Sequence, residues 1–240
     1  MAGTLHIVGT GPGDPELLTV KAARLLAATR AVAYFAKRGR AGQARGIAQA
    51  YIRADAEMMR FEYPYTTEMR ADDPRYVAAL ADFYATSAAA VAARLDADED
   101  VVLLCEGDPF LYGSAMYLFD RLVGRYPTEI VPGIPAMAGC WAEARLPVAH
   151  GDDVLTVLPG TLPQTALVTH LASSDAAVIM KVGSNLAKIR AALAAVGRAG
   201  DAMYVERGTM PASRVIRLDE VGETAPYFSL ILVPGRRGPR

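Results

Sequence analysis

Two short loops combine glycine, proline and acidic residues in a pattern that is typical of ligand binding. The first, Gly9-Thr-Gly-Pro-Gly-Asp14, follows the apolar run 5–8, and the second, Glu106-Gly-Asp-Pro109, follows the apolar run 101–105. Glycine at the carboxyl end of a buried strand allows a tight turn and a close approach of the backbone to a ligand. The two loops therefore predict a single crevice that binds a nucleotide-like molecule.

The spacing of the first loop differs from that of a dinucleotide-binding site. The dinucleotide fingerprint is Gly-x-Gly-x-x-Gly, with an acidic residue at the end of the second strand. In this chain the third glycine, Gly13, comes one position early, and Lys37 and Arg38 stand where the acid is expected. An enzyme that transfers hydride to or from a nicotinamide cofactor is therefore disfavoured.

The sequence offers few residues suited to nucleophilic or metal-assisted catalysis. The chain has two cysteines and three histidines without metal-ligand spacing, so no metal is expected. Cys105 falls in an apolar strand and Cys140 in an alanine-rich helix, so both are expected in the core. No catalytic residue is assigned; Glu106 and Asp108 are the candidates for acid–base work, with a helix cap as the other reading of Asp108.

The composition is that of a globular protein with a sizeable core. Hydrophobic residues make up 52% and charged residues 21% of the 240 residues. A net charge of −1 and a pI near 6.3 argue against a nucleic-acid or membrane-surface binder. No signal peptide and no apolar run of about 20 residues is recognised in the sequence, so a cytoplasmic protein without a membrane partner is expected.

Alternating strands and helices must position the two loops. In the first half, strands are expected at 5–8, 31–35, 101–105 and 129–131. The helix with the plainest signals starts at Asp73 and Pro74, a good cap and a good first-turn residue, and has apolar residues at helical spacing as far as Leu95. A short strand from Met58 to Phe61 and a loop near 63–66 are expected before it.

The second half begins anew near His150. Strands are expected at 154–157, 177–180 and 202–205, and the last two, 215–218 and 227–233, follow each other without a helix, which favours an antiparallel edge. The tail 234–240 is expected to fray. Glycine and proline gather after the strands, where ligands bind in open α/β sheets. The pattern predicts two α/β lobes, 1–149 and 150–240, with an active-site cleft between them.

The sequence resembles the precorrin (tetrapyrrole) methylase family of class III S-adenosylmethionine-dependent methyltransferases. Stretches that resemble the family motifs occur in order over nearly the whole chain, at 8–19, 106–114, 131–136, 178–181 and 204–209. Other stretches resemble the subfamily that methylates precorrin-2 at C20: 34–37, 62–64, Glu106, 158–161, 180–181 and 226–229.

The resemblance implies a homodimer of two-domain chains that binds S-adenosylmethionine in the cleft and releases S-adenosylhomocysteine. Carried over by position, the donor contacts fall on Pro12, Glu106, Gly107, Asp108, Leu111, Pro135, Ala136, Met180 and Gly208. Many members have Thr or Ser where this chain has Pro135, so a hydroxyl contact is lost at that position.

A tetrapyrrole substrate is a polycarboxylate and requires cationic partners, for which the planar fork of arginine is best suited. The candidates are Arg38, Arg40, Arg45, Lys181 and Arg207. Three other interpretations stay open: a methylase of cobalt-factor II, a diphthine synthase, and a nucleotide-binding protein that keeps the fold without the activity.

Overall fold

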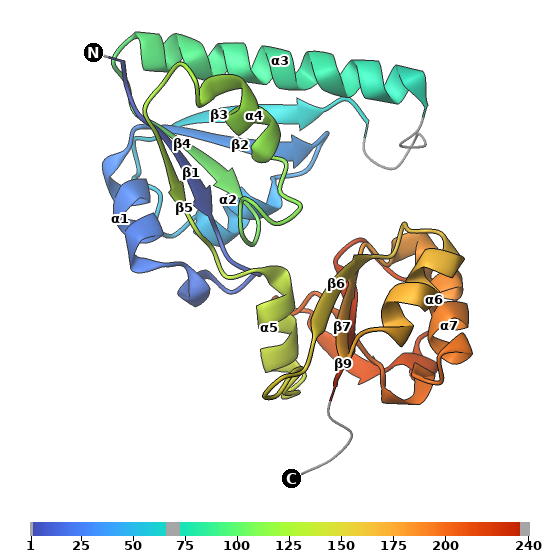
Figure 1. Ribbon diagram of the computed structural model, residues 1–240. Coiled ribbons are helices and arrows are strands. Elements are labelled where there is room, and N and C mark those ends of the chain that lie inside the picture. Colours follow the sequence, from blue (N-terminus) through green and yellow to red (C-terminus); the bar gives the residue numbers. More distant parts are fainter. Residues whose placement is uncertain (1, 66–72, 236–240) are drawn as a thin grey trace. The chain divides into compact units, whose positions relative to one another are not determined.

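The structure, a computed structural model, describes residues 2–65 and 73–235 and divides into two compact units, Met1–Pro135 and Ala136–Arg240 (Figure 1). Each unit contains one five-stranded sheet with helices packed on it, which confirms the predicted α/β class. The division falls earlier than the predicted boundary between residues 149 and 150. The predicted loop near 63–66 and the predicted fraying tail lie partly outside the described residues.

The sheet of the first unit is parallel throughout, with the order β3-β2-β4-β1-β5. Its strands are β1 Leu5–Gly9, β2 Ala31–Lys37, β3 Glu57–Tyr63, β4 Val101–Cys105 and β5 Thr128–Val131. The central strands β1 and β4 are buried along their whole length, as expected for a parallel sheet covered on both faces. Because all five strands run the same way, the loops that follow them lie at one edge.

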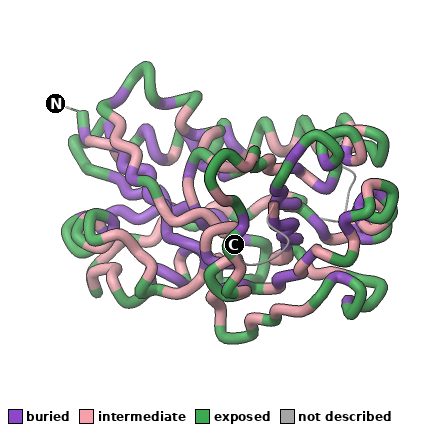
Figure 2. Tube along the Cα trace, turned by 60° about the horizontal axis from the view of Figure 1, so that its bottom comes forward, coloured by how far each residue is buried: buried purple, intermediate pink, exposed green. Residues whose placement is uncertain are grey.

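Helices cover both faces of this sheet, and neighbouring residues of β1 pack against helices on opposite faces. Ile7 packs in the cluster that includes residues of α3 (Pro74–Asp96) and α4 (Met116–Leu122), whereas Val8 packs with α1 (Val20–Ala28) and α2 (Gln43–Ala48). A 3-10 turn, η1 (Pro15–Leu17), precedes α1. Figure 2 shows the buried strand residues as purple segments of the chain.

Helix α3 begins as predicted, with Asp73 accepting a hydrogen bond from the backbone N–H of Arg75 and Pro74 in the first turn. By length and composition alone its 23 residues, with a mean hydropathy of 1.3 over the apolar window, are sufficient to cross a membrane, contrary to the expectation from sequence. Its Tyr84, Val91 and Leu95 pack in the core of the sheet, and 28% of the apolar window is buried.

The sheet of the second unit is mixed, with the order β6-β7-β10-β8-β9. Its strands are β6 Leu155–Pro159, β7 Ala176–Met180, β8 Met203–Glu206, β9 Arg214–Arg217 and β10 Ser229–Val233. Strand β9 is an antiparallel edge strand, but its partner is β8; β10 lies between β7 and β8, antiparallel to both. Strand β9 thus confirms the predicted antiparallel edge, whereas β10 lies in the middle of the sheet, where its apolar residues are buried.

Helices α6 (Gln164–Ala172) and α7 (Leu186–Ala195) contribute to the core on one face of this sheet, and α5 (Ala136–Glu143) packs on the other. Short 3-10 turns lie at Gly183–Asn185, Ala199–Asp201 and Leu218–Glu220. Cys140 of α5 lies in a cluster with Val178, Val205 and Leu230. This packing places α5 in the second unit, although it was predicted in the first.

Candidate functional site

The two glycine-rich loops meet at the carboxyl edge of the first sheet. The backbone N–H of Gly107 donates to the carbonyl of Gly11 at 2.9 Å, and the N–H of Gly11 donates back at 3.3 Å. A Cβ atom on Gly9 would lie 2.5 Å from the nitrogen of Gly133 and 2.6 Å from the carbonyl oxygen of Gly107. Three loops that are distant in sequence thus pack backbone against backbone, which only glycine allows.

Asp108 fixes this arrangement with both of its carboxylate oxygens. Oδ1 accepts a hydrogen bond from the N–H of Phe110 at 2.9 Å, and Oδ2 accepts one from the N–H of Gly133 at 3.1 Å. Helix α4 begins further on, with Ala115 at its cap position, so Asp108 does not cap that helix. It ties the second loop to the third, residues 132–135.

Glu106 is placed differently. Its Oε1 accepts a hydrogen bond from the backbone N–H of Ala44 at 3.2 Å, in the first turn of α2. The residue keeps exposed surface, but the protein atoms crowded around the carboxyl group raise its pKa above the ordinary value, because they remove water from the charged form.

A cluster of hydroxyl groups lies near this loop. Tyr63 at the end of β3, Tyr84 of α3 and Ser114 bring their hydroxyl groups close together, and burial raises the pKa of both phenols. Tyr84 also stacks on Tyr117, with ring centroids 4.4 Å apart. The sequence analysis did not single out Tyr84, which is 5% exposed.

The remaining first-unit residues predicted to bind the donor belong to the same edge. Pro12 stands between Gly11 and Gly13 in the first loop, and the N–H of Leu111 donates to the carbonyl of Asp108 at 3.3 Å. Pro135 is the last residue of the first unit and Ala136 the first of the second. Burial raises the pKa of the Cys105 thiol to about 12, which fits the expected core role.

Three predicted cations lie after β2 or in α2. The guanidinium of Arg45 lies 6.0 Å from the centroid of the Tyr34 ring. Arg38 and Arg40 fall in the turn after β2, where the carbonyl of Arg40 accepts a hydrogen bond from Arg60 at 2.8 Å. Within residues 2–65 and 73–235, none of the three predicted cations forms an ion pair, so each is available for an external carboxylate.

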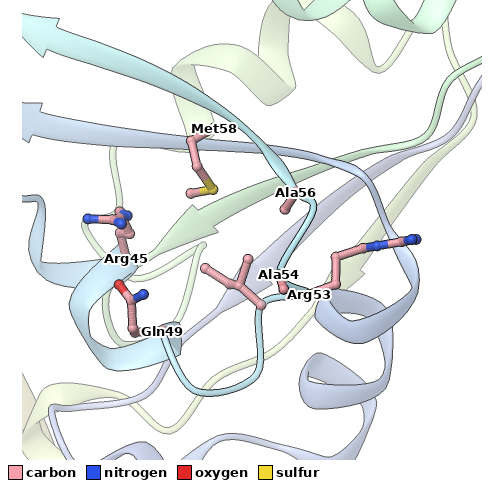
Figure 3. Close-up of a pocket in the computed structure, with 7 residues that line it drawn as sticks. Arg45, Gln49, Arg53, Ala54, Ala56 and Met58 are labelled. Carbon is pink, nitrogen blue, oxygen red and sulfur yellow. The ribbon is translucent and has the colours of Figure 1, made fainter.

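A pocket of about 150 Å³ runs along α2, between that helix and the start of β3 (Figure 3). Arg45 lines it from α2, Gln49 lines it just after that helix, and Met58 lines it from β3. The guanidinium of Arg53 points away from the other labelled side chains and pairs with Asp55 at 2.6 Å. Arg45 is therefore the lining cation without a carboxylate partner among the described residues.

The second unit places its predicted residues at the carboxyl ends of β7 and β8. Met180 ends β7, and its carbonyl accepts a hydrogen bond from the N–H of Gly160 at 2.6 Å. Lys181 and Arg207 have φ angles of 56° and 50°, a conformation that non-glycine residues adopt rarely and that is concentrated at functional sites. Arg207 pairs with Glu206 at 3.3 Å, so its charge is partly compensated within the chain.

Gly208 is required by close packing in the second unit. A Cβ atom at this position would lie 2.5 Å from the sulfur of Cys140 in α5. Among the described residues no group of three or more His, Cys, Asp or Glu side chains is arranged to hold a metal ion. In the part of the chain that the structure describes, the first sheet edge offers backbone amides and carbonyls, arginines without ion-pair partners, and the carboxylates of Glu106 and Asp108.

Comparison with known proteins gives similarities over both units. The family model for Tetrapyrrole (Corrin/Porphyrin) Methylases matches residues 4–222. The chain is 54% identical to a precorrin-2 C(20)-methyltransferase of Sinorhizobium, over 97% of the chain and 96% of the relative. It is 33% identical to a cobalt-precorrin-2 C(20)-methyltransferase of Salmonella typhimurium, over 97% of each.

Among solved structures, the native form of uroporphyrin III C-methyl transferase from Thermus thermophilus has a TM-score of 0.69 and 25% identity. The alignment covers 97% of this chain and 98% of that one. Sequence and structure comparisons therefore agree over almost the full length of the chain.

Proposed function

Because the chain belongs to the tetrapyrrole (corrin/porphyrin) methylase family, we propose that it methylates precorrin-2 at C20, giving precorrin-3A in cobalamin biosynthesis. The observation that carries the proposal is the 54% identity to the Sinorhizobium enzyme over nearly the whole of both chains. The relative named for the cobalt-containing substrate is only 33% identical, which favours the metal-free one.

We propose S-adenosylmethionine as the methyl donor and S-adenosylhomocysteine as the product. The glycine contacts among the first, second and third loops support this, because they bring the three loops together at the carboxyl edge of the sheet, where ligands bind in open α/β sheets. The proposed contacts are Pro12, Glu106, Gly107, Asp108, Leu111 and Pro135 from the first unit, and Ala136, Met180 and Gly208 from the second. For Glu106 and Asp108, whose carboxylates are engaged by backbone N–H groups, the contact is assigned to the main chain.

The bound sulfonium supplies an electrophilic methyl group, and the electron-rich bridge carbon of the substrate supplies the electron pair. Methyl transfer to that carbon would release S-adenosylhomocysteine, and the proton of the bridge carbon would pass to water or to a carboxylate of the substrate. The protein's main task is alignment of the reacting atoms, which contributes about 7–11 kcal/mol in well-oriented reactions. Rigid loops held by Asp108 and by glycine packing are suited to that task.

We assign the substrate carboxylates to Arg38, Arg40 and Arg45 in the first unit and to Lys181 in the second. The three arginines have no ion-pair partner among the described residues, and a guanidinium binds a carboxylate through two parallel hydrogen bonds. Arg207 is the weaker candidate because Glu206 already pairs with it.

The test is incubation of precorrin-2 with the protein and S-adenosylmethionine, followed by mass spectrometry and NMR. The expected result is one added methyl group, located at C20. Parallel reactions with the cobalt-containing substrate decide between the two substrate forms. Methylation at another ring position, or no methylation together with no calorimetric binding of S-adenosylhomocysteine, would overturn the proposal.

We also propose that the protein is a cytoplasmic homodimer, on the strength of the resemblance to its family. Light scattering after size-exclusion chromatography tests the dimer directly. A mass close to the 25.5 kDa of one chain would contradict it.

A further inference from the structure

We propose that Glu106 is a positioning residue: its carboxylate fastens the first turn of α2 to the loop after β4 and thereby holds Arg45 in place for a substrate carboxylate. The effect on substrate rests on the proposed function, whereas the attachment of α2 does not. Glu106 would thus act through Arg45 and not as a proton acceptor.

Helix α2 cannot cap itself. The first N–H groups of any helix lack partners within the helix and are normally bound by a side chain at the cap position. The cap residue of α2 is Gly42, which has a φ of 83° and supplies no capping side chain. A Cβ atom there would lie 2.8 Å from the ring of Tyr34, so a capping residue does not fit. The partner must come from elsewhere in the fold.

Glu106 supplies that partner because β4 lies beside β2. Tyr34 of β2 pairs with Leu104 of β4, so the segment after β4 reaches the helix that follows β2. The N–H of Ala44 donates to Oε1 of Glu106 at 3.2 Å, across 62 positions of sequence. Within the described part of the chain this is the carboxylate's one hydrogen bond.

Arg45 follows Ala44 directly and depends on the same turn. Its guanidinium lies 6.0 Å from the Tyr34 ring centroid, and Tyr34 is only 5% exposed, so the ring is a fixed support. The residue before it, Ala44, is held by the bond to Glu106, and the charged group of Arg45 lies over the ring. Arg45, which has no carboxylate partner among the described residues, is thereby held in one position. This lowers the entropic cost of binding a carboxylate of the substrate.

Amide hydrogen exchange of α2 tests the attachment without any substrate. In Glu106→Ala, exchange at residues 44–47 should be about 10-fold faster than in wild type, the effect of losing one hydrogen bond to a charged acceptor. Glu106→Gln keeps an acceptor oxygen and should stay within about threefold of wild type. Glu99→Gln, the same change just before β4, is the matched control and should leave α2 unchanged. Unchanged exchange in Glu106→Ala would overturn the attachment.

Steady-state kinetics test the consequence for substrate. Glu106→Ala should raise the KM for precorrin-2 about 10-fold, while the Kd for S-adenosylhomocysteine stays within about threefold. Arg45→Met should have a similar effect, and the double variant should be no worse than Arg45→Met, because the two changes remove one interaction. Glu106→Gln should restore the KM.

Two outcomes would refute the assigned role. Weakening of S-adenosylhomocysteine binding as large as the change in KM would make Glu106 a direct donor contact. A fall in kcat in Glu106→Gln with KM unchanged would make it a proton acceptor. Should the wild-type protein fail to methylate precorrin-2, the proposed function fails, but the exchange experiment still decides whether Glu106 holds α2.

Discussion

Replacement of Gly133 by alanine is the sharpest test of the loop junction. A Cβ atom at this position would lie 2.1 Å from the carbonyl oxygen of Gly107 and 2.8 Å from the Cα of Gly9. Both neighbours are backbone, so no flexible side chain can move aside. The carbonyl of Gly107 would have to retreat by about 1.3 Å to reach ordinary contact.

The expected loss of stability follows from these contacts. Overpacking against backbone costs about 1–3 kcal/mol, and the displaced N–H of Gly133 gives up its bond to Asp108, worth about 1.5–3 kcal/mol. Gly133→Ala should therefore lower the free energy of unfolding by about 2.5–6 kcal/mol in urea titrations. Since the same junction forms the proposed donor site, affinity for S-adenosylhomocysteine in calorimetry should fall by at least about 10-fold.

Gly124→Ala is the matched control. A Cβ atom there meets nothing within 4 Å, so stability should change by less than about 0.5 kcal/mol. Equal stabilities of the Gly133→Ala and Gly124→Ala proteins would refute the packing of the three loops. A destabilised Gly133→Ala protein with unchanged affinity would keep the packing but remove the donor from this junction.

Three further predictions follow from single contacts. Gly46→Ala lies inside α2 with open space around its Cβ position and should raise the free energy of unfolding by about 0.5–1 kcal/mol in urea titrations; a loss would contradict the helix at that position. Asp108→Asn leaves the N–H of Gly133 facing an amide group, so the free energy of unfolding should fall by about 1–3 kcal/mol. The affinity for S-adenosylhomocysteine, measured by calorimetry, should fall with it. Unchanged values of both would show that the hydrogen bonds of Asp108 are dispensable. Because the fold raises the pKa of Glu106, the ionised carboxylate destabilises the folded state, and stability rises as the pH falls through that pKa. Glu106→Gln should therefore have a higher Tm than wild type at alkaline pH, and the difference in Tm should shrink towards acidic pH. A difference in Tm that grows on acidification would contradict the sign of the pKa shift.

Much of the fold and part of the site follow from local sequence signals. The helix start at Asp73 and Pro74 was predicted because capping and first-turn preferences act within a few residues. The ends of β1 and β4 were predicted because an apolar run that leads into a glycine-containing loop is a local signal for the end of a strand. The two loops that carry Gly11 and Gly107 were likewise visible in the sequence as candidate ligand loops.

The pairing of distant segments was not predictable in the same way. The position of β10 between β7 and β8, and the packing of α5 on the second sheet, depend on contacts between residues far apart in the chain. The hydroxyl cluster of Tyr63, Tyr84 and Ser114 joins a strand, a helix and a loop, and no local pattern signals it.

Sequence alone determined the class of the fold, the family, and the loops that meet at the site, because periodicity, turn chemistry and motif order are written in neighbouring residues. Only the tertiary structure separated the two acidic candidates, giving both oxygens of Asp108 to backbone amides and one oxygen of Glu106 to Ala44. The physical reason is that a carboxylate's role depends on which donors the fold brings within about 3 Å of it, and those donors come from other segments.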